Sequence, residues 1–104
     1  MGLGMGQESQ SNMKAILNNE PVFLKKSTYS NNSSLALQAV CLDGEPFATL
    51  SVNLLESKNL PPNQCYFKHY SENEGLLEQL LNQNLIKLTG QASHQGMPLV
   101  EILF

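Results

Sequence analysis

Two cysteines and two histidines are the residues of this chain that could bind a metal ion or act in nucleophilic catalysis: Cys41, Cys65, His69 and His94. Cys65 and His69 are four residues apart, a spacing that would bring them together on a helix. The run that holds them instead predicts a strand, where they would lie about 13 Å apart on one face. No C-x-x-C pair is present, and Cys41 falls at a predicted core position. A buried thiol and two unrelated histidines therefore explain the pattern better than a zinc site does.

We accordingly expect no metal site, no cofactor and no catalytic residues, with a small Cys/His enzyme or metalloprotein as an alternative. The sequence lacks the local motifs of a nucleophile elbow, a P-loop and a dinucleotide-binding turn. Glu72, Glu74 and Glu78 are explained as cap, dipole and surface groups of a predicted helix. Asp43, the only aspartate of the chain, is explained by a predicted turn.

Charge is sparse and acidic: 14% of the residues are charged, the formal net charge is −3, and the chain has no arginine. Arginine supplies the planar donor pair that grips phosphate groups, so we expect no nucleic-acid partner. No apolar run reaches the length of about 18 residues that a membrane helix needs. The first residues also lack the cationic and apolar parts of a secretory signal. We expect no membrane partner and a cytoplasmic location, where both cysteines stay reduced.

The clearest local signal is the Asp43-Gly44 pair between two alternating apolar runs, which predicts a β-hairpin. A two-residue turn would pair Ala39 with Ala48, and a four-residue loop over residues 43–46 keeps the same parity. A three-residue loop would place apolar side chains opposite polar ones and is therefore disfavoured unless a bulge intervenes. The predicted core face is Leu35, Leu37, Ala39, Cys41, Leu50, Val52 and Leu54. The opposite face would carry Gln38, Val40, Phe47 and Thr49.

One helix is predicted late in the chain. Ser71 and Glu74 form a capping box at its start, the leucines at 76, 77, 80 and 81 recur at helical spacing, and Asn84 suits a left-handed residue after its end. Strands outside the hairpin are expected at residues 22–29, 65–70, 86–88 and 98–104. The order β-β-β-β-α-β-β predicts an α+β fold, a single mostly antiparallel sheet with the helix packed on one face.

The chain divides into two parts by composition. Residues 1–19 are polar and Gly-rich, and we expect a flexible tail, part of which precedes a native start near Met13 in one interpretation. Residues 20–104 are expected to form a single α+β domain.

Three stretches carry a family resemblance: Gly44-Glu45-Pro46-Phe47-Ala48, Ser51-Val52-Asn53-Leu54 and Ser71-Glu72-Asn73. With their surroundings from Thr28 to Phe104 they resemble a bacterial family of small proteins catalogued as domain of unknown function 4313. The resemblance implies a protein encoded on plasmids, conjugative elements or phages. The family has no assigned activity, so it supplies no functional residues.

These observations predict a non-enzymatic protein-interaction module of a bacterial mobile element. The candidate interaction surface is Gln38, Val40, Phe47, Thr49, Tyr66, Lys68 and Tyr70, together with the loop at residues 90–97. Tyrosine is a frequent interface anchor, although Tyr66 and Tyr70 could equally pack beneath Pro61-Pro62. An anti-defence inhibitor that binds a host nucleic-acid-processing enzyme is an alternative function. We expect a protein partner, and an exposed edge strand or sheet face could also allow a homodimer.

Overall fold

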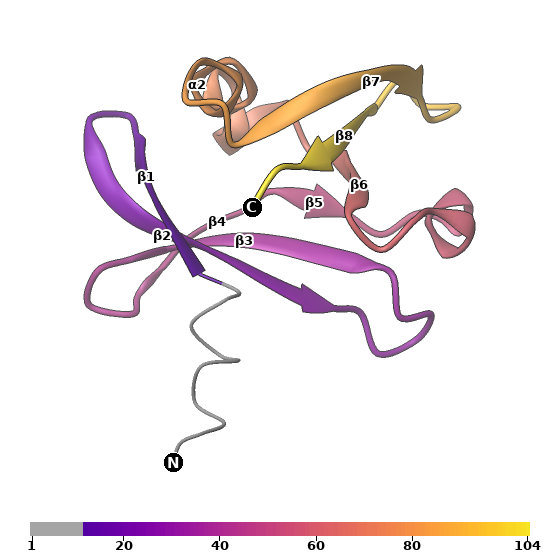
Figure 1. Cartoon of the computed structure of the whole chain (residues 1–104), viewed down its shortest axis with the longest axis horizontal. Helices are drawn as coiled ribbons and strands as arrows, with labels where there is room; N and C mark the ends of the chain where they lie inside the picture. The colour runs from indigo at the N-terminus through magenta and orange to yellow at the C-terminus, as the bar shows by residue number, and fades with distance from the viewer. Residues whose placement is uncertain (1–11) are drawn as a thin grey trace.

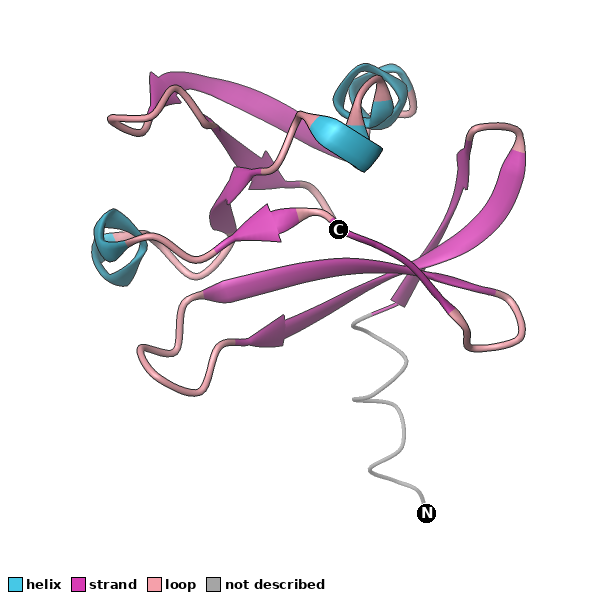
Figure 2. Ribbon diagram, turned by 180° about the vertical axis from the view of Figure 1, so that it is seen from behind, coloured by secondary structure: helices cyan, strands magenta, loops and turns pink. Residues whose placement is uncertain are grey.

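The computed structural model describes residues 12–104, which form two four-stranded antiparallel sheets and one α-helix (Figures 1 and 2). The first sheet has the strand order β1-β2-β3-β4 and the second the order β5-β6-β8-β7. The strands of the first sheet are β1 (Asn12–Leu17), β2 (Glu20–Thr28), β3 (Leu35–Cys41) and β4 (Pro46–Thr49). Those of the second are β5 (Ser51–Val52), β6 (Gln64–Phe67), β7 (Ile86–Ala92) and β8 (Pro98–Ile102). The helical segments are η1 (Leu55–Asn59), η2 (Ser71–Asn73) and α2 (Leu76–Asn82).

The mostly β architecture with one helix agrees in broad terms with the α+β class, but the prediction of a single sheet is wrong. The chain leaves the first sheet and enters the second at Leu50, between β4 and β5. The Leu50 N–H donates to the Leu37 carbonyl at 2.9 Å, and the Leu50 carbonyl accepts from the Lys68 N–H at 2.7 Å. Leu50 is therefore hydrogen-bonded to both sheets, and its side chain is buried between them.

This crossing changes which residues face the core. The predicted core positions Leu35, Leu37, Ala39 and Leu50 are all buried. After Leu50, however, Ser51 is buried while Val52 and Leu54 are partly exposed, so the predicted alternation fails there. Cys41, also predicted in the core, is half-buried because β3 ends at that residue.

Strand β1 lies within the region that composition assigned to a tail, so the predicted boundary after residue 19 is wrong for residues 12–17. Ala15 and Leu17 are buried in the core. The chain returns into β2 through Asn18 and Asn19, both with positive φ, as a tight hairpin turn requires. An Asn-Asn pair between two alternating runs was the available signal. Residues 1–11 of the predicted tail lie outside the described part of the chain.

The predicted hairpin forms with a bulge. Ala39 pairs with Ala48 as expected, and Gly44 takes the positive φ of 93° that a turn glycine can adopt. The register then shifts, so that Val40 lies opposite Pro46 instead of Phe47. Proline has no N–H to donate and is tolerated at such irregular edge positions. The shift directs Phe47 against the hydrophobic core, and the predicted placement of Phe47 on the opposite face is wrong.

The helix begins four residues later than the capping box predicts, at Leu76 with Gly75 as its N-cap. Ser71–Asn73 forms the 3₁₀ turn η2, and Gly75, in a left-handed conformation with φ 86°, separates it from α2. Leu76 and Leu80 of α2 are fully buried against the sheets. The predicted left-handed end at Asn84 is confirmed by its φ of 61°.

Candidate interaction surface

The side of the first sheet that faces away from the core carries an exposed apolar surface. Residues on this side alternate along each strand with core residues such as Leu17, Val22 and Ala39. We call this surface the outer face. Its members are Lys14, Ile16, Pro21, Phe23, Lys25, Gln38, Val40, Leu42, Pro46 and Thr49.

Strand register places apolar side chains of the outer face next to one another. Phe23 lies opposite Val40 at the middle of the sheet, and both are partly exposed. Ile16 lies opposite Pro21 and is 48% exposed. Leu42, just beyond the end of β3, is 50% exposed. Aliphatic side chains that project this far from a sheet offer apolar area to a partner.

Three predicted surface residues belong to the outer face, and they border a shallow hollow. Gln38 pairs with Thr49, and Val40 follows on the same side of β3. The hollow has a volume of about 200 Å³. Its lining residues are Gln38, Ala39, Val40, Pro46, Phe47, Ala48 and Thr49. The parity argument therefore located one part of the outer face, while Ile16 and Phe23 were missed because β1 and β2 were not paired in the prediction.

Charged groups are distributed unevenly around the outer face. Lys14 and Lys25 project among its apolar side chains and are exposed. Three carboxylates, Glu20, Asp43 and Glu45, lie near the two turns at one end of the sheet, and Glu20, which pairs with Leu17, belongs to the core side of β2. Burial, and secondarily these three carboxylates, raise the pKa of the neighbouring Cys41 thiol. Cys41 is consequently protonated at neutral pH and a poor nucleophile.

The other predicted surface residues, Tyr66, Lys68 and Tyr70, do not share one exposed strand face. Tyr66 lies in β6 and is only 7% exposed, whereas Tyr70 follows the end of that strand and is 45% exposed. The Lys68 ammonium lies 5.6 Å from the centre of the Tyr70 ring and 2.9 Å from Glu72. This group is a local cluster ahead of η2, and its lysine is already paired.

Asn73 connects the end of β4 in the first sheet with the end of β6 in the second. The sequence analysis did not identify this residue. Its side-chain amide is fully buried and donates to the Thr49 carbonyl at 2.8 Å and to the Lys68 carbonyl at 2.9 Å. These carbonyls belong to the end of β4 and to the residue after β6. Asn73 thus fastens η2 to both sheets close to the crossing at Leu50. Its side-chain oxygen has no hydrogen-bond partner within the described residues.

The Lys68–Glu72 pair gives a prediction for pH dependence. The hydrogen bond from Lys68, with smaller contributions from backbone and Ser71 donors, lowers the pKa of Glu72 from 4.5 to about 2. Because this pKa is lower in the folded protein, the stabilisation is present above about pH 4.5 and is lost as the pH falls toward 2. Lys68→Met should raise the Glu72 pKa toward its ordinary value, as measured by NMR titration of the carboxyl group. Lys87→Met is the matched control and should leave it unchanged.

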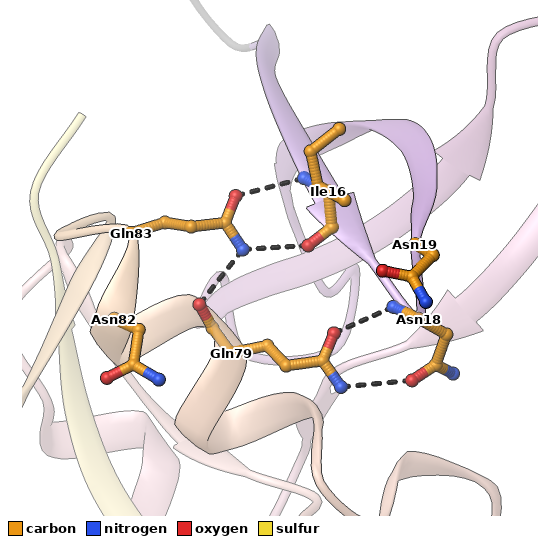
Figure 3. Close-up of a pocket in the computed structure, with 6 residues that line it drawn as sticks. All are labelled: Ile16, Asn18, Asn19, Gln79, Asn82 and Gln83. Atoms are coloured by element: carbon orange, nitrogen blue, oxygen red, sulfur yellow. Dashed lines mark hydrogen bonds between the residues drawn. The ribbon is translucent and has the colours of Figure 1, made fainter.

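Two glutamines, Gln79 of α2 and Gln83 directly after its end, cover the free edge of β1 (Figure 3). Gln83 accepts from the Ile16 N–H at 2.9 Å and donates to the Ile16 carbonyl at 2.7 Å. Gln79 makes the corresponding pair with the Asn18 N–H and side chain. The space beside these contacts, about 520 Å³, is open and bordered mainly by amide side chains. The two amides satisfy backbone groups that would otherwise be free to pair with another strand.

Removing one of these amides should expose the edge locally. Gln83→Ala is expected to speed hydrogen exchange of the Ile16 amide about fivefold, since a net hydrogen bond contributes roughly 1 kcal/mol. Exchange measured residue by residue by NMR would test this. Asn82→Ala, an exposed position on the same helix, is the control, and an equal acceleration there would contradict the assigned role of Gln83.

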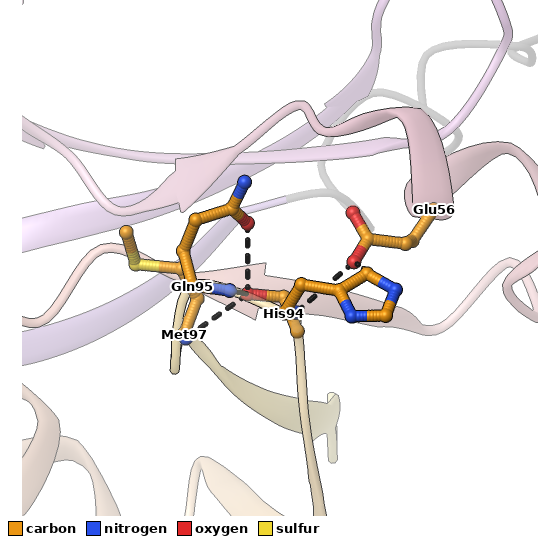
Figure 4. Close-up of polar contacts among 5 residues, drawn as sticks. Glu56, His94, Gln95 and Met97 are labelled. Atoms are coloured by element: carbon orange, nitrogen blue, oxygen red, sulfur yellow. Dashed lines mark hydrogen bonds and ion pairs between the residues drawn. The ribbon is translucent and has the colours of Figure 1, made fainter.

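The cysteines and histidines do not come together. Cys65 is buried in β6, and burial raises the pKa of its thiol to about 12. Within residues 12–104 no three His, Cys, Asp or Glu side chains form a group that could hold a metal ion. His94 instead belongs to the β7–β8 loop, where its N–H donates to Glu56 of η1 at 3.1 Å (Figure 4). The imidazole Nε2 of His94 lies 3.8 Å from the same carboxylate. These two contacts attach the loop at residues 90–97, part of the predicted interaction surface, to η1.

Comparisons of the chain with protein-family models, with curated proteins and with solved structures find no match. The family resemblance stays a prediction from the sequence. Within the described residues no helix has the length and apolar content needed to cross a membrane.

Proposed function

We propose that this chain is a protein-interaction module that binds its partner through the outer face. The observation that carries the proposal is the apolar surface built by β1, β2 and β3, where Phe23 lies opposite Val40 and Ile16 and Leu42, nearer the turn end of the sheet, are about half-exposed. Burying these side chains would contribute favourable free energy in proportion to the apolar area removed from water, roughly 25 cal/mol per Å².

The remaining features support binding in preference to covalent chemistry. The Cys65 thiol is buried with a pKa raised to about 12. Lys68 and Glu72 form an ion pair with each other, so neither side chain is free to act as a base or a nucleophile. The proposed setting on a bacterial mobile element rests on the sequence resemblance alone.

Photo-crosslinking in bacterial cells tests this function. A photoreactive amino acid at position 42 reports on the outer face, and the same group at position 55 is the control, because Leu55 is 88% exposed on η1 and lies away from that face. We expect a discrete protein adduct from position 42 and none from position 55. Absence of an adduct at position 42, or the same adduct from both positions, would contradict the proposal.

A further inference from the structure

We propose that the space between α2 and the β1–β2 turn is a binding site for a neutral, hydroxyl-rich ligand of the saccharide class. This inference goes beyond the proposed interaction through the outer face. The space has a volume of about 520 Å³, which falls in the range of small-molecule sites, roughly 300–1,000 Å³. We call it the amide site, because all but one of its bordering residues carry a side-chain amide. These residues are Ile16, Asn18, Asn19, Gln79, Asn82 and Gln83.

The chemistry of the amide site favours a neutral ligand. Among the described residues, no lysine, arginine, aspartate or glutamate borders it. An anionic ligand would find no ion-pair partner there, and a metal ion would find no carboxylate. Each side-chain amide presents an acceptor oxygen beside a donor nitrogen, and a hydroxyl group can both donate and accept. Neighbouring amides therefore match a ligand that carries several hydroxyl groups.

Two of the five amides are held in place by the fold (Figure 3). Gln83 is bonded to both backbone groups of Ile16 and also donates to the Gln79 carbonyl at 2.9 Å. Gln79 accepts from the Asn18 N–H at 2.7 Å and donates to the Asn18 side-chain oxygen at 2.9 Å. Because these groups are positioned before a ligand arrives, less conformational entropy is lost on binding.

The other three amides are available to a ligand. Within the described residues, the side chains of Asn19 and Asn82 form no hydrogen bond, and Asn18 uses only its side-chain oxygen. All three residues are exposed. Ile16, which is 48% exposed, borders the same space and offers apolar contact to the C–H groups of a sugar ring.

The β1–β2 turn gives an independent argument. Asn18 and Asn19 both have positive φ, 54° and 66°, as in a two-residue type I′ turn. Glycine is the preferred second residue of such a turn, because it adopts positive φ without strain. The turn itself thus does not require the amide of Asn19, which borders the amide site. A ligand contact explains why asparagine stands at this position.

Two other kinds of neutral ligand fit the amide site less well. A nucleobase is usually stacked on an aromatic or arginine side chain, and neither borders the site among the described residues. An extended peptide would pair with the β1 edge. The Ile16 N–H and carbonyl at that edge are already bonded to Gln83, so a peptide would have to displace these contacts.

NMR titration of the full chain with glucose, galactose, N-acetylglucosamine and maltose tests the inference. We expect at least one of these sugars to shift the side-chain amide signals of Asn19 and Asn82 in a saturable way. The dissociation constant should lie in the millimolar range, because the site is open. Adenosine and tetra-alanine represent the nucleobase and the peptide. The absence of saturable shifts with every sugar up to about 100 mM, or tighter binding of adenosine or tetra-alanine than of every sugar, would overturn the inference.

A matched pair of variants tests which residues bind the sugar. Asn19→Gly removes one amide and suits the positive φ of the turn, so it should keep the fold and weaken sugar binding at least fivefold, the effect of roughly one net hydrogen bond. Asn84→Gly is the control, because Asn84 is exposed with a φ of 61° but does not border the amide site. Its sugar affinity should equal that of the wild type. Equal weakening by both variants would overturn the assignment, and circular dichroism checks that both keep the fold.

These measurements are independent of the proposed function. Leu42→Lys changes the outer face at a position that does not border the amide site, so it should leave sugar binding unchanged. A failure of the crosslinking experiment at position 42 would remove the proposed interaction and leave the sugar site standing. A failure of the sugar titration would do the reverse.

Discussion

Replacing Leu50 with alanine should lower the free energy of unfolding by about 2–5 kcal/mol, the cost typical of removing a buried leucine side chain. Leu50 is fully buried where the chain passes from the first sheet to the second, and its backbone is hydrogen-bonded to Leu37 and to Lys68. A cavity at this point would be bordered by parts of both sheets, so relaxation of one sheet alone could not fill it. Urea denaturation followed by circular dichroism measures the loss.

Leu55→Ala is the matched control for this prediction. The chemical change is the same, but Leu55 is 88% exposed on η1. Its substitution should alter the free energy of unfolding by no more than about 0.5 kcal/mol. Similar losses for the two variants would show that Leu50 is not a packed junction between the sheets.

The crossing at Leu50 also shows where prediction from the sequence stops. Parity around Asp43-Gly44 correctly assigned Leu35, Leu37, Ala39 and Leu50 to the core, because a hydrogen-bonded hairpin imposes strict alternation. Beyond Leu50 the sequence L-S-V-N-L continues to alternate, and neither glycine nor proline marks the change of sheet. The exchange of hydrogen-bonding partners depends on strands far away in the sequence, so local periodicity could not reveal it.

Only part of the outer face was predicted, because local periodicity reveals strand pairing only between strands that are close in the sequence. Gln38, Val40 and Thr49 could be placed because the Asp43-Gly44 turn directly connects β3 with its partner β4. Ile16 and Phe23 reach this face through the pairing of β1 with β2 and of β2 with β3. The signal for the first pairing was present in the Asn18-Asn19 turn, but the polar, Gly-rich composition of the preceding residues outweighed it.

Asn73 represents a different limit of sequence reasoning. Asparagine next to Gly75 and two glutamates reads as an exposed turn residue, and its burial follows only from the positions of two backbone carbonyls. Those carbonyls belong to Thr49, 24 residues away, and to Lys68, five residues away. Such a side-chain-to-backbone contact has no sequence pattern, because any residue type supplies the acceptor.

Asn73→Ala should lower the free energy of unfolding by about 2–4 kcal/mol, since two partly buried carbonyls would lose their donor and each unpaired group costs roughly 1–3 kcal/mol. Asn73→Asp keeps the size of the side chain but removes the amide donors, so it should destabilise to a similar extent and separate hydrogen bonding from cavity formation. Asn82→Ala, at an exposed position of α2, is the control and should change stability by less than about 0.5 kcal/mol. If Asn73→Asp were as stable as the wild type in urea denaturation, the two hydrogen bonds would not be what fastens η2 to the sheets.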